Sequence, residues 1–243
     1  MSEQTANGTA IVAAEDLHTY YGASYILHGV SLTIHKGESV ALMGRNGMGK
    51  TTTIRSIFGL TPPRRGTVTI QGRIMTGVPA NYVAKEGLAL VPEGRGIFPN
   101  LSVRENLIMA EGPSKDGRVD WTLERVLDTF PRIGERLGNM GNHLSGGEQQ
   151  MLSIGRALMT NPDLLILDEA TEGLAPLIRA EIWSVVNEIR KTGIATLIVD
   201  KDVNRLLKVC DRCIILEKGR VVYEGTAAEL EANPDIHVKY LGV

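Results

Sequence analysis

The sequence predicts an α/β fold, and three observations indicate it. Short apolar runs typical of buried strands alternate with stretches of helical spacing in the C-terminal half of the chain. The apolar run 39–43 is followed by a glycine-rich loop and a helical pattern, which is the order strand, loop, helix. Strand patterns vanish between residues 93 and 143, where helical patterns replace them. We therefore expect an α/β core with an antiparallel β flank and an inserted helical subdomain.

The segment before residue 44 is rich in strand patterns. Ile11 and Val12 begin one apolar segment, and residues 30–34 alternate between apolar and polar side chains. Short turns between such segments favour antiparallel pairing, so this part should form the flank. Taken in order, the chain is expected to form strands from residue 11 and at 30–34, 39–43, 66–71, 88–91, 164–167, 196–199, 213–216 and 221–223, a helix at 51–58 and a short helix at 79–85.

The helical subdomain contains two predicted helices. Ser102 is followed three residues later by Glu105, the spacing of a capping box, and a second helix is predicted from Asp120 to Thr129. The sequence has no internal repeat, low-complexity tract or long linker, which favours a single domain. We expect that domain to span residues 11–243, with a core lobe at 11–92 and about 152–243, a helical arm at about 93–151 and a flexible tail at 1–10.

The composition excludes several classes of protein. The 243 residues are 43% hydrophobic and 22% charged, which is globular and sufficient for a sizeable core. A formal net charge of −2 gives no positive field for nucleic acid, which we do not expect as a partner. The sequence has no apolar run near the ~18 residues of a membrane-spanning helix, and its first nine residues are polar. We expect a soluble, cytosolic chain.

The two cysteines and five histidines do not form a metal-binding pattern. Cys210 and Cys213 supply half of a zinc site at most, and no second pair completes it. We interpret them as ordinary buried cysteines, with a redox role or a metal shared with a partner as the alternatives. The histidines are scattered, so we interpret them as structural or surface residues.

Residues 44–51, Gly-Arg-Asn-Gly-Met-Gly-Lys-Thr, match the pattern of a phosphate-binding loop. Glycines let backbone N–H groups surround a polyphosphate, Lys50 can reach the β- and γ-phosphates, and the Thr51 hydroxyl can bind Mg²⁺. The alternative is a Gly-rich turn that binds nothing, which the flanking strand and helix disfavour. The predicted nucleotide-binding residues of this stretch are Gly44, Arg45, Asn46, Gly47, Met48, Gly49, Lys50, Thr51 and Thr52.

Two adjacent carboxylates, Asp168 and Glu169, end the apolar run Leu-Leu-Ile-Leu. A buried parallel strand delivers its terminal side chains to the ligand edge of the sheet, and successive side chains point to opposite faces. Asp168 suits Mg²⁺, and Glu169 suits the general base that activates a water attacking the γ-phosphate. The alternative is an acidic helix cap without a metal.

A second glycine-rich helix start occurs at Leu-Ser-Gly-Gly-Glu-Gln-Gln, residues 144–150. Ser145 and Glu148 have capping-box spacing, and Met151, Ile154 and Leu158 share one face of the predicted helix. Two successive glycines reduce helix stability by roughly 1 kcal/mol each relative to alanine, which a cap does not require. They leave N–H groups open for a second anion at the positive helix end.

The motifs GRNGMGKT, LSGGEQQ and LLILDE, in that order and spacing, resemble the nucleotide-binding subunits of ABC transporters from about Ile11 onward. The resemblance implies a P-loop NTPase core of the ABC-ATPase type and an Mg²⁺-dependent ATPase that drives transport, with ATP and Mg²⁺ as cofactors. It also implies that two such subunits close head to tail. Each ATP would then lie between one phosphate loop and the partner's signature residues, which correspond here to Ser145, Gly146, Gly147 and Glu148.

Residues 91–107, 173–176 and 240–242 look like the corresponding regions of bacterial importers of branched-chain amino acids. In that family the subunit pairs with a second ABC ATPase under two membrane permeases and a periplasmic solute-binding protein, on the inner face of the cell membrane. Urea and short-amide importers share many of these features, so the cargo stays open. The permease is expected to dock on the helical arm, where the apolar residues Ile97, Phe98 and Leu101 either line the groove or pack in the core.

Two further residues have roles that follow from the resemblance. Tyr21, with Tyr20 as second choice, lies where ABC ATPases carry an aromatic side chain that stacks on adenine, and simple packing is the alternative. Glu93 replaces the usual glutamine that senses Mg²⁺, and its carboxylate is a candidate metal ligand. Ala175 stands where many relatives have an aspartate, which removes one polar contact across the subunits.

Lys201 stands where the superfamily usually places a histidine that contacts the γ-phosphate. An ammonium can donate to phosphate, but its charge would weaken Glu169 as a base. We expect Lys201 to act as a γ-phosphate sensor, with a solvent-exposed lysine as the alternative. Lys50, Glu169 and Lys201 are thus the predicted catalytic residues.

The sequence disfavours two other functional classes. One is a nucleotide-gated dimerisation module with weak hydrolysis, which the presence of Lys50, Asp168 and Glu169 disfavours. The other is a soluble ABC protein of translation or DNA repair, which usually carries fused duplicate cassettes or a long coiled coil that this sequence lacks.

Overall fold

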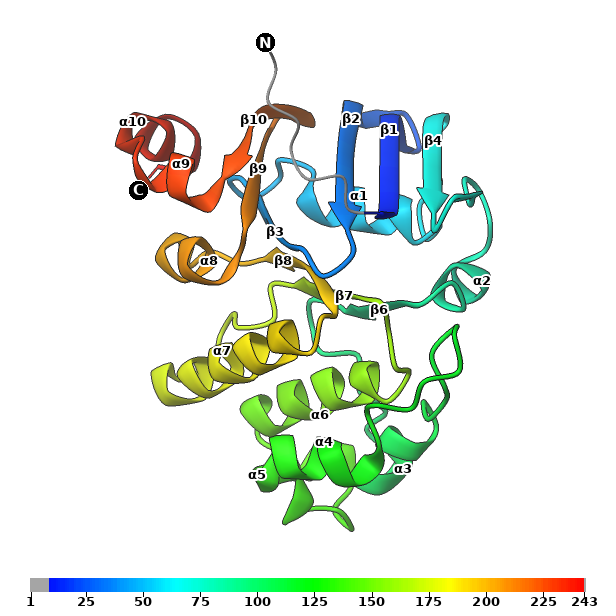
Figure 1. Cartoon of the computed structure of the whole chain (residues 1–243). Helices are drawn as coiled ribbons and strands as arrows, with labels where there is room; N and C mark the ends of the chain where they lie inside the picture. Colours follow the sequence, from blue (N-terminus) through cyan, green and yellow to red (C-terminus); the bar gives the residue numbers. More distant parts are fainter. Residues whose placement is uncertain (1–8, 243) are drawn as a thin grey trace. The chain divides into compact units, whose positions relative to one another are not determined.

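The structure is a computed structural model that describes residues 9–242 (Figure 1). The chain divides into two compact units. The middle unit contains residues 87–209, and the terminal unit contains the described residues up to 86 and from 210 onward. These boundaries differ from those of the predicted core lobe and helical arm, and that division stays a prediction. Residues 1–8 of the predicted tail lie outside the described residues, and the first strand begins at Ala10.

The terminal unit contains a four-stranded antiparallel sheet with the strand order β2-β1-β4-β5. β1 pairs antiparallel with both β2 and β4, which confirms the predicted flank. Val68 and Ile70 on β4 are buried while Thr67 and Thr69 are partly exposed, because alternate side chains point to opposite faces. The strands are β1 (Ala10–Tyr21), β2 (Ser24–His35), β4 (Arg65–Ile70) and β5 (Arg73–Ile74).

A second group of strands in the terminal unit leads into the phosphate loop. β3 pairs parallel with β9, and β9 pairs antiparallel with β10. All five residues of β3 are buried, and β3 is followed directly by the loop and α1, so the predicted order of strand, loop and helix is confirmed. The elements are β3 (Ser39–Met43), β9 (Arg212–Glu217), β10 (Arg220–Thr226), α1 (Lys50–Ile57), α2 (Ala80–Ala84), α9 (Ala227–Glu231), α10 (Pro234–Ile236) and the π turn η2 (His237–Leu241).

Arg212 connects three parts of the terminal unit. Its Nε donates to Glu38 Oε1 at 2.7 Å, and its guanidinium also bonds Glu224 and the carbonyl of Thr33. The side chain of Arg212 is only 18% exposed. Burial raises the pKa of Glu38, but the hydrogen bonds from Arg212 and from the His35 N–H outweigh it, so the pKa is lowered. The start of β9 is thereby attached to the turn between β2 and β3.

The middle unit contains three parallel strands in the order β6-β7-β8. Every residue of β7 and β8 is buried, which is typical of parallel strands covered on both faces. Met151, Ile154 and Leu158 of α6 are fully buried, as predicted from their spacing. The elements are β6 (Leu88–Val91), β7 (Leu164–Asp168), β8 (Ala195–Val199), α6 (Gly146–Leu158), α7 (Pro176–Lys191) and α8 (Val203–Val209).

Short helices occupy the segment between β6 and α6. The capping box at Ser102 and Glu105 is confirmed, since Ser102 N donates to Glu105 Oε2 at 2.8 Å and Glu105 N donates to Ser102 Oγ at 3.2 Å. The predicted start at Asp120 is wrong by three residues, because the Thr122 side chain caps the next helix. The elements are α3 (Val103–Ile108), α4 (Leu123–Thr129), α5 (Pro131–Gly134) and the 3₁₀ turn η1 (Gly141–His143).

Cys210 and Cys213 are both buried and form no disulfide, as predicted for ordinary buried cysteines. Burial raises the pKa of Cys213 to about 12, so this thiol stays protonated at neutral pH.

Among the residues that the structure describes, no helix is both long and apolar enough to cross a membrane.

Candidate functional site

The phosphate loop of the terminal unit takes its shape from three glycines. Gly44, Gly47 and Gly49 have φ angles of 137°, 77° and 106°, a region that other residues rarely adopt. A Cβ on Gly44 would lie 2.4 Å from the carbonyl oxygen of Leu216, and a Cβ on Gly49 would lie 2.8 Å from Leu27 Cδ2. Gly44 and Gly49 are therefore required by the close approach of the loop to β9 and β2 as well as by their conformation, and Gly47 is required by its conformation alone.

Lys50 begins α1, and its ammonium lies against the loop. Its Nζ donates to the carbonyl of Gly44 at 2.8 Å and to that of Arg45 at 3.2 Å, and the residue is 7% exposed. Thr51 is partly buried and Thr52 is buried in the first turn of the helix. Together, a glycine-rich loop, a lysine side chain and a helix N-terminus form a site that can bind polyphosphate.

The structure distinguishes the two tyrosines at the end of β1. The ring of Tyr20 stacks on Tyr25 with centroids 4.3 Å apart, and the Cζ of Arg64 lies 4.3 Å from the same ring. Tyr21 is 44% exposed. Since Tyr20 already has packing partners, Tyr21 is the better candidate for stacking on a ligand.

The acidic edge of the middle unit begins where β7 ends. Asp168 is 3% exposed, and Glu169 follows it with a φ angle of 52°, which is uncommon for a residue with a side chain. Glu169 N donates to the carbonyl of Val199 at 2.8 Å, so Glu169 stays attached to the end of β8. The left-handed backbone removes Glu169 from the regular strand, and the predicted alternation of side chains therefore ends at Asp168.

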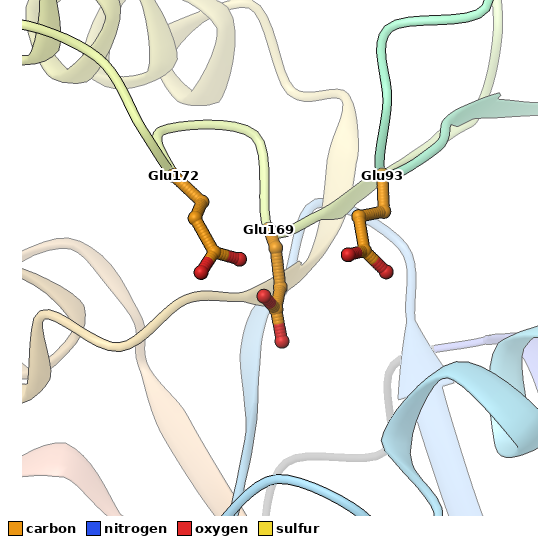
Figure 2. A group of neighbouring side chains, drawn as sticks. All are labelled: Glu93, Glu169 and Glu172. Atoms are coloured by element: carbon orange, nitrogen blue, oxygen red, sulfur yellow. The ribbon is translucent and has the colours of Figure 1, made fainter.

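Three glutamates bring their carboxylates together in the middle unit (Figure 2). One oxygen of each of Glu93, Glu169 and Glu172 lies within 4.8 Å of the other two. The ammonium of Lys201 donates a hydrogen bond to Glu172, and its Nζ lies 3.8 Å from Glu169 Oε2. The bond to Glu172 and the charges of the glutamates raise the pKa of Lys201. The ammonium of Lys201 is therefore the positively charged group beside this cluster of three carboxylates.

A pocket of about 330 Å³ opens beside this cluster. Glu169 and Glu172 line it from the segment after β7, Asp200 and Lys201 from the segment after β8, and Arg179 from α7. The pocket is thus polar and carries both signs of charge.

The signature segment has the predicted capping box at the start of α6. Ser145 N donates to Glu148 Oε2 at 2.7 Å, and Glu148 N donates to Ser145 Oγ at 3.4 Å. Burial raises the pKa of Glu148, but the bonds to Ser145 and the charge of Arg136 outweigh it, so the pKa is lowered. Glu148 is therefore ionised at neutral pH and stabilises the helix start.

The two signature glycines also have a packing role that the sequence did not reveal. A Cβ on Gly146 would lie 2.8 Å from the guanidinium of Arg95, and a Cβ on Gly147 would lie 2.6 Å from Ile178 Cγ2. The contact with Ile178 therefore requires glycine at position 147, whereas the flexible Arg95 side chain can shift away from a Cβ at position 146. The second anion site at these N–H groups stays a prediction.

Arg95 is a residue that the sequence interpretation missed. It has a φ angle of 69°, its carbonyl accepts a hydrogen bond from Ser153 Oγ at 2.5 Å, and its guanidinium donates to Gln149 Oε1 at 3.1 Å. These bonds attach the segment after β6 to α6. The sequence feature that could have drawn attention to Arg95 is the glycine on each side of it.

Comparisons with known proteins agree with these motifs. The sequence pattern of the ABC transporter family matches residues 27–172, which is more than half of the chain. The chain belongs to the ABC transporter family. It is accordingly a nucleotide-binding ATPase.

Two relatives of this ABC ATPase cover almost its whole length. The high-affinity branched-chain amino acid transport ATP-binding protein BraG of Pseudomonas aeruginosa is 39% identical over 96% of this chain and 100% of its own. The lipopolysaccharide export system ATP-binding protein LptB of Escherichia coli is 33% identical over 96% of this chain and 98% of its own.

Solved structures show that the ABC ATPase has the fold of ATP-binding cassettes. An ATP-binding subunit of an ABC transporter matches with a TM-score of 0.79 and 31% identity over 96% of both chains. A dimeric cassette in a post-hydrolysis state, bound to ADP and Pi, matches with a TM-score of 0.76 and 27% identity over 89% of this chain and 98% of its own. The predicted α/β fold class is therefore confirmed.

Proposed function

We propose that this ABC ATPase energises the import of branched-chain amino acids. One observation carries the proposal: 39% identity over the full length of BraG, compared with 33% identity to LptB. The resemblance of residues 91–107 to the same importers supports it.

We propose a second ABC ATPase subunit and two membrane permeases as direct partners, and a periplasmic solute-binding protein as an indirect one. The dimeric state of a similar cassette supports the pairing of two ATPase subunits. With these partners the chain is a cytoplasmic protein attached to the inner face of the membrane. Phe98 is a candidate contact for the permease because it is 45% exposed. Part of its ring is already in contact within the chain, since the Cζ of Arg156 lies 5.0 Å from the ring centroid.

ATP binding is assigned to the phosphate loop. The N–H groups of residues 44–49 and the ammonium of Lys50 take up the charge of the β- and γ-phosphates. Lys50 now donates to the carbonyls of Gly44 and Arg45, so on binding ATP it exchanges carbonyl partners for phosphate oxygens. Tyr21 offers its exposed ring to the adenine.

Glu169 is assigned as the general base that orients the attacking water and accepts its proton. Its side chain is 12% exposed, which limits competition from bulk solvent. Thr51, Asp168 and Glu93 would hold Mg²⁺, since hydroxyl and carboxylate oxygens are the ligands that this ion prefers. When bound, Mg²⁺ neutralises charge on the transferred phosphoryl group.

Two further groups act on phosphate in this proposal. Lys201 donates to the γ-phosphate of its own subunit's ATP, in place of the usual histidine. Ser145, Gly146 and Gly147 bind the γ-phosphate of the partner's ATP at the N-terminus of α6, while Glu148 stabilises that helix start.

The test of the cargo is uptake by the source organism after deletion of the gene. Uptake of labelled leucine, isoleucine and valine should fall, and it should return when the parent chain is supplied but not when Glu169→Gln is supplied. Labelled urea and acetamide are the comparison solutes. Loss of urea or acetamide uptake with unchanged leucine uptake would assign the chain to a urea or short-amide importer instead. Full restoration of uptake by Glu169→Gln would favour a nucleotide-gated module without essential hydrolysis.

A further inference from the structure

The segment after β7 contains one charged residue that the proposed mechanism does not use, Glu172. We propose that Glu172 is a positioning residue that holds the ammonium of Lys201 away from Glu169, so that the Glu169 carboxylate can orient water. This inference rests on the proposed role of Glu169 as the general base.

The backbone around Lys201 is held on both sides. Thr171 Oγ1 donates to Asp200 Oδ2 at 2.6 Å, and Asp202 N donates to Asp200 Oδ1 at 2.9 Å. Asp202 Oδ1 accepts a hydrogen bond from Arg205 N at 3.1 Å, which caps the start of α8. The position from which the Lys201 side chain extends is therefore well defined.

A turn brings both glutamates close to the ammonium of this lysine. Glu172 N donates to the carbonyl of Glu169 at 3.2 Å, and Glu169 N is bonded to the end of β8 at Val199. Figure 2 shows the carboxylates of Glu169 and Glu172 next to each other, with Glu93 on the other side of Glu169. Lys201 thus has two carboxylates within reach from one turn.

The distances show which carboxylate Lys201 uses. Its Nζ bonds Glu172, whereas its 3.8 Å separation from Glu169 Oε2 exceeds the hydrogen-bond range of up to ~3.2 Å. The side chain of Glu169 is 12% exposed and that of Glu172 is 44% exposed. A direct ion pair at Glu169 would be less screened by water and hence stronger. Without the charge of Glu172, the flexible Lys201 side chain should move to Glu169.

The consequence of that movement follows from the chemistry of a carboxylate base. An ionised carboxylate only accepts hydrogen bonds, and an ammonium bonded to it competes directly with water. A general base contributes about 10²–10⁴-fold to a rate, so a partly blocked base should slow hydrolysis by at least about tenfold.

The experiment is a double-mutant cycle on the purified full chain, measuring the rate of phosphate release at saturating ATP and the affinity for ATP. Glu172→Gln should lower the rate at least about tenfold with ATP affinity changed less than about twofold. Lys201→Gln should itself lower the rate, because Lys201 is proposed to donate to the γ-phosphate. Relative to that lowered rate, adding Glu172→Gln should change the rate less than about twofold, because the competing ammonium is gone. Glu188→Gln is the matched control, since Glu188 pairs with Lys191 at 2.7 Å on the exposed face of α7.

The crystal structure of the Glu172→Gln chain gives a second readout that does not depend on turnover. The Nζ of Lys201 should move from 3.8 Å to direct hydrogen-bond distance from Glu169. An Nζ that stays in place, an unchanged rate, or an equal loss of rate in both backgrounds would overturn the positioning role. Hydrolysis by Glu169→Gln at the parental rate would instead refute the proposed base, so the two failures are distinguishable.

Discussion

Asn106→Leu should lower the stability of the middle unit by about 3 kcal/mol, because Asn106 attaches the segment before α3 to that helix. Asn106 is 0% exposed, and its Oδ1 accepts a hydrogen bond from the Phe98 N–H at 2.9 Å. Its Nδ2 donates to the carbonyls of Phe98, Leu101 and Ser102 at 2.9, 3.2 and 3.0 Å. Neutral hydrogen bonds contribute about 0.5–1.5 kcal/mol each, and a buried N–H left without a partner costs about 1–3 kcal/mol more. Burial of the leucine side chain offsets about 1.5–3 kcal/mol of this loss.

Thermal unfolding followed by circular dichroism measures the effect. For a chain of 150–250 residues, 1 kcal/mol shifts Tm by about 2–4 °C, so the expected decrease is about 6–12 °C. Asn100→Leu, in the same segment but exposed, is the control and should change stability by less than about 0.5 kcal/mol. Equal shifts for the two variants would refute the assignment of these hydrogen bonds as the main attachment of the segment.

Two further substitutions test packing and charge. Gly147→Ala should destabilise the start of α6 by about 1–3 kcal/mol in thermal unfolding, because its Cβ would lie 2.6 Å from Ile178, whereas Gly138→Ala has open space and should have little effect. Arg212→Ala should lower the stability of the terminal unit by about 3 kcal/mol at pH 7, since it leaves the half-buried Glu38 without its partner. The pKa of Glu38 is lowered in the fold, so the stability from this pair is present above the unfolded pKa of about 4.5 and is lost as the pH falls through the lower folded pKa. Parent and Arg212→Ala should therefore differ less at pH 3 than at pH 7, and an equal difference at both would contradict the pairing.

The parts of the fold that were predicted correctly depend on local sequence. The capping boxes at Ser102 and Ser145 need partners only three residues away, and buried strands such as β3 have continuous apolar runs. The start of α4 was misplaced because Asp120 and Thr122 are both good capping residues, and only the structure shows that Thr122 accepts the bond.

The parts that were missed depend on contacts between distant residues. Glu172 bonds a lysine 29 positions away, and nothing in its own neighbourhood marks it. The contact of Gly147 with Ile178 likewise joins α6 to α7, so the sequence could show an unusual glycine pair but not its packing role. The left-handed backbone of Glu169 is a third such feature, since the apolar run before it predicts a regular strand.

The proposed mechanism depends on Glu169 as the base of an ATP-hydrolysing site. The most direct test is single-turnover hydrolysis of radiolabelled ATP by the purified chain and its Glu169→Gln variant, together with ATP binding by both. We expect the variant to bind ATP with parental affinity and to release phosphate at least about 10²-fold more slowly. Unchanged single-turnover hydrolysis by Glu169→Gln would contradict it.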